Sequence, residues 1–218
     1  MPFSINDFKS NGLVLGGARP TLFQVVIPNL PSLAGVDGPG GGQSSGPPLT
    51  GKVSLLAKAA TIPPSLVDSV DVGYMGRKVK VVGDRTFPNW SCTIMNDEDF
   101  LVRNAFEDWH EILNSREPNL LTKIAPVSGT SNGTTDPNNY KRDITVIQFS
   151  KGGAALKVYT LIGAFPVTVA PIPLDYDATN QIEMFEVEFA YDLWEPVDAS
   201  AVNTLGPGPT AAQSNQNI

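Results

Sequence analysis

Residues 76–109 constrain the fold more than any other part of this 218-residue chain. The stretch begins with alternating cations and valines, passes through a Gly-Asp turn and a proline, and reaches an apolar run that contains Trp90 and Cys92. Asparagine and acidic residues then precede apolar side chains at helical spacing. This succession predicts a hairpin, a strand and a capped amphipathic helix, which together form a scaffold element rather than a catalytic pocket.

The helix is expected to begin at Asn96 or Asp97, with Glu98 and Asp99 near the positive end of the helix dipole. The three acidic residues could also be a paired-carboxylate site, but helix capping explains them with fewer assumptions. Six apolar side chains recur at helical spacing and predict one buried stripe. They are Val102, Ala105, Phe106, Trp109, Ile112 and Leu113.

Strand-like runs separated by glycine and proline occupy much of the remaining chain. The expected strands are 21–27, 52–60, 67–74, 77–82, 90–95, 143–150, 155–163, 167–171 and 181–194. We therefore expect a mainly β fold, an antiparallel β-sandwich or barrel of about eight strands with one α-helix at an end or edge.

One β-domain is expected over residues 1–198, followed by a flexible, uncharged tail over 199–218. Polar loops are expected at 32–51, which is rich in glycine, proline and serine, and at 127–139. A phosphate-binding loop would need a Gly-Lys-Ser/Thr end followed by a helix. Here Gly51 and Lys52 lead into an expected strand, which argues against that site.

The net charge of −7 argues against a sequence-specific binder of duplex DNA, because such proteins need a basic surface. With one cysteine and one histidine, the chain offers no internal disulfide, no metal set around His110 and no catalytic triad. We therefore expect no enzyme, no cofactor and no bound metal. No apolar run approaches the ~18 residues of a membrane span, and no secretory signal is visible, so we expect folding in a cytoplasm without membrane insertion.

Two segments alternate in character along their length. Lysines at 78 and 80 alternate with valines at 79 and 81, which places the two kinds of side chain on opposite strand faces. In 181–194, one face is mainly apolar and the other is mixed and acidic, as in a sheet that is half buried. The cations of the first segment could contact nucleic acid, but the acidic total charge favours a solvated face or pairing with acidic groups on a neighbour.

Taken together, these residues resemble the tail tube protein family of contractile-tailed bacteriophages. The resemblance is strongest within 76–109, and it extends more weakly over most of residues 1–198. The residues that carry it are Gly76-Arg77-Lys78, Gly83-Asp84-Arg85-Thr86-Phe87, Trp90, Asn96-Asp97, Phe100 and Phe106-Glu107-Asp108-Trp109.

The resemblance implies a structural virion protein whose subunits form homohexameric rings with a continuous inner β-barrel. Rings would stack head to tail into a tube. The implied partners are a tail sheath protein, baseplate and tail-terminator proteins, and genomic DNA that passes through the lumen without specific binding. The implied location is the virion tail, after assembly in the host cytoplasm.

Two groups of charged residues are candidates for these roles. Carboxylates lining the lumen would repel DNA phosphates, so that DNA does not stall. The lumen candidates are Glu183, Glu186, Glu188 and Asp192. The candidates for subunit or ring contacts are Arg77, Lys78, Lys80, Asp84 and Arg85.

Two alternatives remain open at this point. A ring-forming tube protein of a bacterial secretion or contractile injection system would share the architecture. A β-barrel that binds a small ligand would instead be a stable monomer with a closed pocket.

Overall fold

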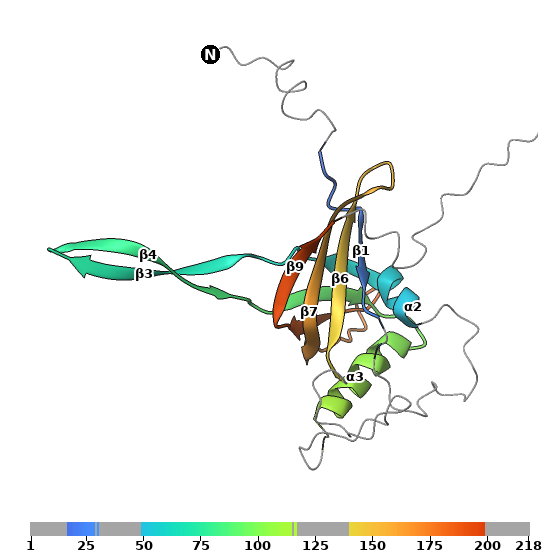
Figure 1. The fold of residues 1–218 in the computed structure, drawn as a ribbon. Helices are drawn as coiled ribbons and strands as arrows, with labels where there is room; N and C mark the ends of the chain where they lie inside the picture. Colours follow the sequence, from blue (N-terminus) through green and yellow to red (C-terminus); the bar gives the residue numbers. More distant parts are fainter. Residues whose placement is uncertain (1–16, 29, 31–48, 115, 117–139, 199–218) are drawn as a thin grey trace, which may run out of the picture.

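The computed structural model describes residues 17–28, 30, 49–114, 116 and 140–198 (Figure 1). The expected loop at 127–139 and the expected tail at 199–218 lie outside these residues. The described part contains nine strands and two helices. The strands are β1 (Phe23–Val26), β2 (Ala57–Ala60), β3 (Leu66–Tyr74), β4 (Arg77–Thr86), β5 (Trp90–Met95), β6 (Arg142–Phe149), β7 (Ala155–Val169), β8 (Met184–Ala190) and β9 (Leu193–Val197), and the helices are α2 (Leu49–Leu56) and α3 (Leu101–Leu113).

Seven strands form one bent sheet in the order β1-β6-β7-β8-β5-β2, with β9 also paired to β7. All the pairings are antiparallel, which confirms the expected mainly β, antiparallel class. One half contains β1, β6, the first part of β7 and β9; the other contains the end of β7, β8, β5 and β2. Apolar side chains of both halves belong to a single core cluster, so the bent sheet closes on itself like a sandwich.

The bend lies where Gly163 of β7 faces the break between β8 and β9. Gly163 has a φ of 69°, and its N–H donates to an Asp143 carboxylate oxygen at 2.9 Å. Any other residue would be strained at this positive φ, and its Cβ would also displace the Asp192 carboxylate, so glycine is favoured here. Two strands expected at 155–163 and 167–171 are therefore one strand, β7, which turns from one half of the sheet into the other.

The single strand expected over 181–194 is divided at Tyr191 and Asp192. The two resulting strands, β8 and β9, continue along one edge of β7, with Ala190 opposite Phe165 and Leu193 opposite Ile162. Apolar and polar residues alternate through Tyr191 and Asp192 without interruption, so the sequence contained no sign of the break between β8 and β9.

The segment 52–60 was expected to be a strand and the loop before it was expected to reach residue 51. The first part of this strand and the end of the loop are wrong, because α2 covers Leu49–Leu56 and only β2 is extended. Residues 32–48 of the expected loop lie outside the described residues. Tertiary contacts favour the helix. Val53 is buried in the core, and the Lys52 ammonium lies 2.9 Å from the Asp97 carboxylate and also contacts Asp99.

The expected start of the long helix is also wrong. Helix α3 begins at Leu101, after Phe100 in a left-handed conformation with a φ of 52°. The Asn96 N–H instead donates to the Glu183 carbonyl at 2.9 Å, beyond the end of β5. The acidic residues before the helix lie in a turn in which Asp97 and Asp99 bind the Lys52 ammonium. The hydrogen bond from this ammonium is the main reason why the pKa of Asp97 is lowered. The helix is not capped from Asn96 or Asp97; instead the Asp99 carboxylate accepts a hydrogen bond at 3.1 Å from the N–H of Leu101, the first residue of α3.

Five of the six residues of the stripe predicted for α3 are buried, and the sixth, Leu113, is partly buried against the core. Val102, Ala105, Phe106, Trp109 and Ile112 are all at most 4% exposed. The Phe106 ring lies 6.4 Å from that of Trp109, 6.4 Å from that of Phe185 and 6.0 Å from that of Phe189, between centroids. The helix is thereby held against β8.

The tryptophans are also fixed by hydrogen bonds. The Trp109 indole N–H donates to the Tyr140 carbonyl at 2.8 Å, and the Trp90 indole N–H donates to that of Thr61 at 2.6 Å. Cys92 beside them is 2% exposed, and burial raises the pKa of its thiol to about 12. The cysteine is thus an unreactive core residue, as its place in the strand suggested.

Truncating Phe106 tests the importance of this cluster. We expect Phe106→Ala to lower the free energy of unfolding by about 3–5 kcal/mol, because it removes a fully buried ring and leaves a cavity. Urea denaturation followed by circular dichroism measures the change. Leu156→Ala, at a leucine that is 47% exposed, is the control and should cost less than about 0.5 kcal/mol. Equal effects of the two changes would contradict the central role of Phe106.

Candidate assembly surfaces

Strands β3 and β4 form a separate two-stranded hairpin that projects far from the rest of the described chain (Figure 1). The 67–74 and 77–82 hairpin expected from the sequence is confirmed, and it is longer than expected. Every residue of both strands is exposed except the partly buried Gly83. An isolated hairpin of two strands is only marginally stable in water. A surface that packs on the hairpin would therefore stabilise it.

The two faces of the hairpin differ in chemistry. One carries two cross-strand valine pairs, Val70 with Val81 and Val72 with Val79, and these side chains are each 48–54% exposed. The other face carries Asp71, Lys78 and Lys80, with 3.6 Å between the Lys78 ammonium and the Asp71 carboxylate. Such an exposed ion pair contributes little to stability. The valine face is the larger source of binding free energy once another surface covers it.

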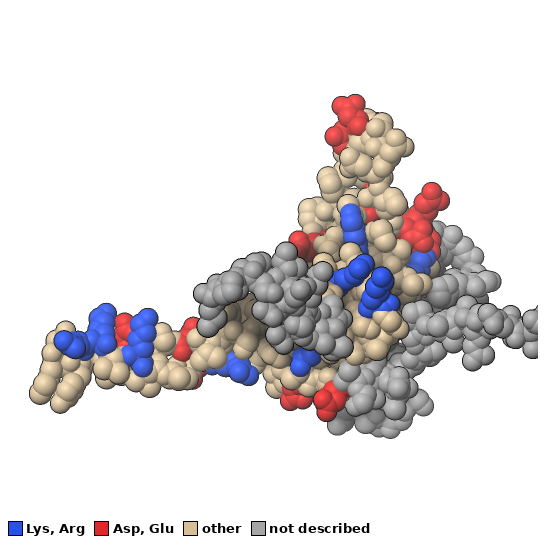
Figure 2. All heavy atoms as spheres, turned by 90° about the horizontal axis from the view of Figure 1, so that it is seen from above, with Lys and Arg blue, Asp and Glu red and all other residues tan. Residues whose placement is uncertain are grey.

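All five interface candidates lie on β4. Arg77, Lys78, Lys80, Asp84 and Arg85 are exposed there. Figure 2 shows Lys and Arg side chains gathered toward the outer part of the projecting hairpin. The structure thus brings this group together on one element.

The lumen candidates are not all brought together. Glu186 and Glu188 lie on the face of β8 opposite its buried Phe185, Val187 and Phe189. They stand beside the polar side chains of β5, with Glu186 opposite Thr93 and Glu188 opposite Ser91.

The other two lumen candidates lie away from this face. The Glu183 carboxylate precedes β8 and accepts a hydrogen bond from the Asn96 side chain at 3.0 Å. Asp192 lies in the break between β8 and β9, where its carboxylate is 2.7 Å from the Lys141 ammonium. The acidic exposed face of the sheet therefore depends on Glu186 and Glu188.

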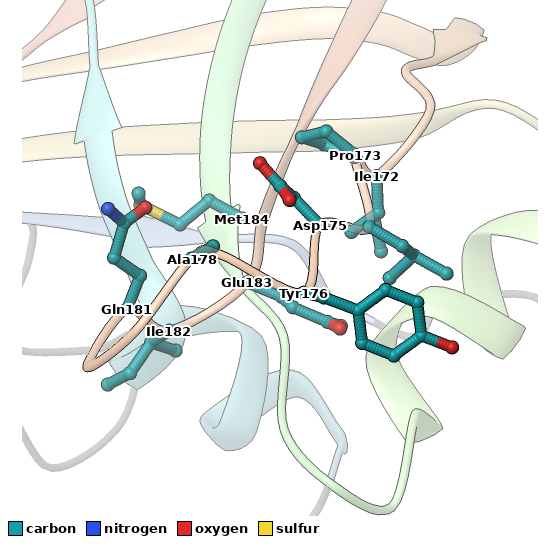
Figure 3. A pocket seen from close by; sticks show the side chains of 10 residues that line it. Ile172, Pro173, Asp175, Tyr176, Ala178, Gln181, Ile182, Glu183 and Met184 are labelled. Atoms are coloured by element: carbon teal, nitrogen blue, oxygen red, sulfur yellow. The ribbon is translucent and has the colours of Figure 1, made fainter.

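A further surface was not recognised from the sequence. The loop 170–183 between β7 and β8 exposes Leu174, Tyr176 and Ile182. With neighbouring residues they line an open hollow of about 500 Å³ (Figure 3). A signal was present, because this segment mixes large apolar residues with three acidic residues and contains no cation.

Two other kinds of site are absent from the described ranges. In these ranges, no group of three or more His, Cys, Asp and Glu side chains could hold a metal ion. Neither described helix is long and apolar enough to cross a membrane.

Removing the hairpin tests whether it supports the rest of the fold. Leu66 and Thr86 are cross-strand partners, so an Asn-Gly turn can join them in place of residues 67–85. We expect a folded protein whose midpoint of thermal unfolding shifts by less than about 4 °C, because the projecting strands pair only with each other. Thermal melts followed by circular dichroism check this. Loss of the cooperative transition would show that the hairpin belongs to the folding unit.

Comparisons with known proteins show what this chain is similar to. The family model described as phage tail tube protein matches residues 18–196. The tail tube protein gp19 of Enterobacteria phage T4 is 34% identical over 181 residues, which cover 82% of this chain and 91% of that protein. The gp19 protein of Enterobacteria phage T6 is 33% identical, with the same coverage.

The fold is shared with chains of a contractile injection system solved by cryo-electron microscopy. A chain of the PVC sheath/tube terminator in the extended state has a TM-score of 0.51 and 15% identity, covering 84% of this chain and 99% of its own. A chain of the PVC sheath-tube complex has a TM-score of 0.50 and 14% identity, covering 90% of this chain and 99% of its own. The family match over residues 18–196, together with the 34% identity to gp19 of phage T4, shows that this chain belongs to the phage tail tube protein family.

Proposed function

We propose that copies of this chain close into hexameric rings, and that the rings stack into the tail tube through which phage DNA passes. The hairpin carries the proposal. Its valine face is about half exposed, its strands pair with no other described strand, and it projects away from the core (Figure 1). Burying a valine fully contributes roughly 1.5–3 kcal/mol, so covering four half-exposed valines would supply several kcal/mol to assembly.

The edges of the sheet support ring formation. Among the described strands in the half of the sheet that contains β8, β2 pairs with β5 alone, and residues 165–169 of β7 pair with β8 alone. Open edges offer unpaired N–H and C=O groups to another chain, and joining copies edge to edge into a barrel removes them. We propose that these two edges meet between neighbouring subunits.

The proposed barrel has an inner face that suits DNA passage. If the polar face of β5 and β8 lines the lumen, Glu186 and Glu188 are repeated in every subunit. A ring of carboxylates repels phosphate, so DNA passes without adhering. The other charged group, on the hairpin, is then available for contacts between subunits or rings.

The partners follow from the same assembly. Chains with this fold occur in structures of a sheath-tube complex and a sheath/tube terminator. We propose corresponding partners here, namely a tail sheath, a baseplate and a tail terminator, with assembly in the host cytoplasm and a final place in the virion tail. The role is structural rather than enzymatic.

The alternatives have less support. A tube protein of an injection system shares the fold, but the family match and the identity to T4 gp19 favour a phage tail. A ligand-binding barrel would need a hollow interior. Here the described interior is filled by large side chains such as Trp90, Phe106 and Phe189.

Negative-stain electron microscopy of the purified protein tests the proposal, with rings or tubes as the expected result. We expect Lys78→Glu/Lys80→Glu to leave the subunit folded but to shorten or abolish the tubes, because the contacts of the hairpin would become repulsive. Lys151→Glu/Lys157→Glu changes the net charge equally on another exposed site and is the matched control. An unchanged protein that stays monomeric at all concentrations would refute the proposed function, whereas unchanged tube lengths would refute only the role of the lysines.

Charge reversal in the lumen gives a second test. Glu186→Lys/Glu188→Lys should leave tube formation possible and make the tubes retain DNA, with an affinity that falls steeply as salt rises. Co-sedimentation of tubes with labelled DNA at several salt concentrations measures this. Glu195→Lys/Asp198→Lys is the charge-matched control. Equal DNA retention by both variants would contradict the assignment of the lumen face.

A further inference from the structure

The loop 170–183, which we name the acidic loop, is shaped before any partner binds. At its start, an Arg103 guanidinium N–H of α3 donates to the Ala170 carbonyl at 2.6 Å. At its end, the Glu183 carbonyl accepts the Asn96 N–H. In between, the Asp177 N–H donates to the Asp175 carboxylate at 3.0 Å. A loop held at both ends loses little conformational entropy on binding, which favours its use as a docking site.

The surface of the acidic loop is apolar and negatively charged. Leu174 is 83% exposed, Tyr176 is fully exposed and Ile182 is 65% exposed. Figure 3 shows that the hollow beside them is lined from this loop and the first residue of β8. The acidic residues of the loop are Asp175, Asp177 and Glu183. Exposed apolar groups of this size, bordered by charge, mark an interaction site for a partner that is itself apolar and basic.

The outer end of the hairpin, residues 72–80, has the complementary chemistry; we name it the hairpin tip. It carries the three cations Arg77, Lys78 and Lys80. The one carboxylate beside them is that of Asp71, which lies opposite Lys80 and 3.6 Å from the Lys78 ammonium, so positive charge is in excess. Large apolar side chains are also exposed at its end, with Tyr74 at 66% and Met75 at 87%. The hairpin tip and the acidic loop thus both combine apolar surface with charge, which is positive on the tip and negative on the loop.

The turn at the hairpin tip adds an independent observation. Met75 and Gly76 both have positive φ, 46° and 79°, as in a type I′ turn, whose first position favours asparagine, aspartate or glycine. Methionine in this conformation is strained, and its side chain is exposed to water. A flexible, polarizable side chain that the turn disfavours and that packs on nothing in the described chain is suited to contact with a partner.

We propose that the hairpin tip of one copy docks in the hollow of the acidic loop of a second copy, with Tyr74 and Met75 against Leu174, Tyr176 and Ile182. The cations of the tip then lie among the carboxylates of the loop. The occupant belongs to another copy because the tip projects away from its own core (Figures 1 and 2). Because two different surfaces meet, the contact is heterologous, and further copies can be added through it without limit, as the stacking of rings requires. This inference rests on the proposed tube and names the contact that joins its subunits.

Cysteine cross-linking tests the contact directly. Cys92, the single cysteine, is buried and has a raised thiol pKa, so it does not compete. Met75→Cys/Ile182→Cys and Met75→Cys/Leu174→Cys are each assembled and then treated with an added oxidant. We expect a ladder of covalent oligomers on a non-reducing gel from at least one of the pairs, and no product beyond a dimer from any single variant. The control is Met75→Cys/Leu55→Cys, because Leu55 of α2 is 74% exposed.

The outcomes separate this inference from the proposed function. Tubes without a ladder from either pair, or with a ladder only from the Leu55 control, overturn the docking contact and leave the tube intact. Absence of any rings or tubes from the unchanged protein refutes the tube proposal itself. A ladder from a loop pair in assembled protein supports both.

Four further variants test the contact: one excludes an effect through hairpin folding, and three test the pairing of charges. Met75→Asn suits the type I′ turn better, so the hairpin should persist, whereas the critical concentration for tube formation should rise by about tenfold. Arg77→Glu and Asp177→Arg should each weaken assembly, and the double variant should restore it. Unchanged assembly by Met75→Asn, or failure of the charge exchange to restore tubes, would overturn the docking contact.

Discussion

The packing of Phe106 of α3 against Phe185 and Phe189 of β8 is the contact on which the rest of the structure depends. It fixes which face of β8 is buried. Because side chains alternate along a strand, Glu186 and Glu188 must then point to the opposite, exposed face. The placement of an acidic surface is therefore a consequence of hydrophobic packing on the other side of the same strand.

The hairpin is the physical opposite of this core. Its valines are paired across the strands but remain half exposed, and its strands pair only with each other. Such an arm gains its main stabilisation from a surface that another molecule provides. The chain thus combines a core whose apolar side chains are buried with a hairpin and an acidic loop whose apolar side chains stay exposed. This arrangement is expected of a subunit that polymerises.

Much of this arrangement was predictable where the pattern is strongly periodic. The hairpin, β5 and the buried stripe of α3 followed from alternation or helical spacing. The predictions failed where local pattern and tertiary contact disagreed. Residues 49–56 form a helix because Val53 is buried in the core and Lys52 binds two aspartates. The residues that make these contacts are distant from the helix in sequence. The helix begins at Leu101 rather than near Asn96, because the Asn96 N–H bonds to Glu183 at the end of the sheet.

The sequence by itself determined the family, the antiparallel β class, and the two faces of each alternating strand, because these depend on residue order and period alone. Only the tertiary structure decided which carboxylates share a surface. Asp192 has the same strand parity as Glu186 and Glu188, yet the bend at Gly163 places it in a break beside Lys141. It also revealed the acidic loop and the projection of the hairpin. Both depend on how segments distant in sequence are arranged in space. No local sequence pattern shows which apolar side chains stay exposed after the core has packed.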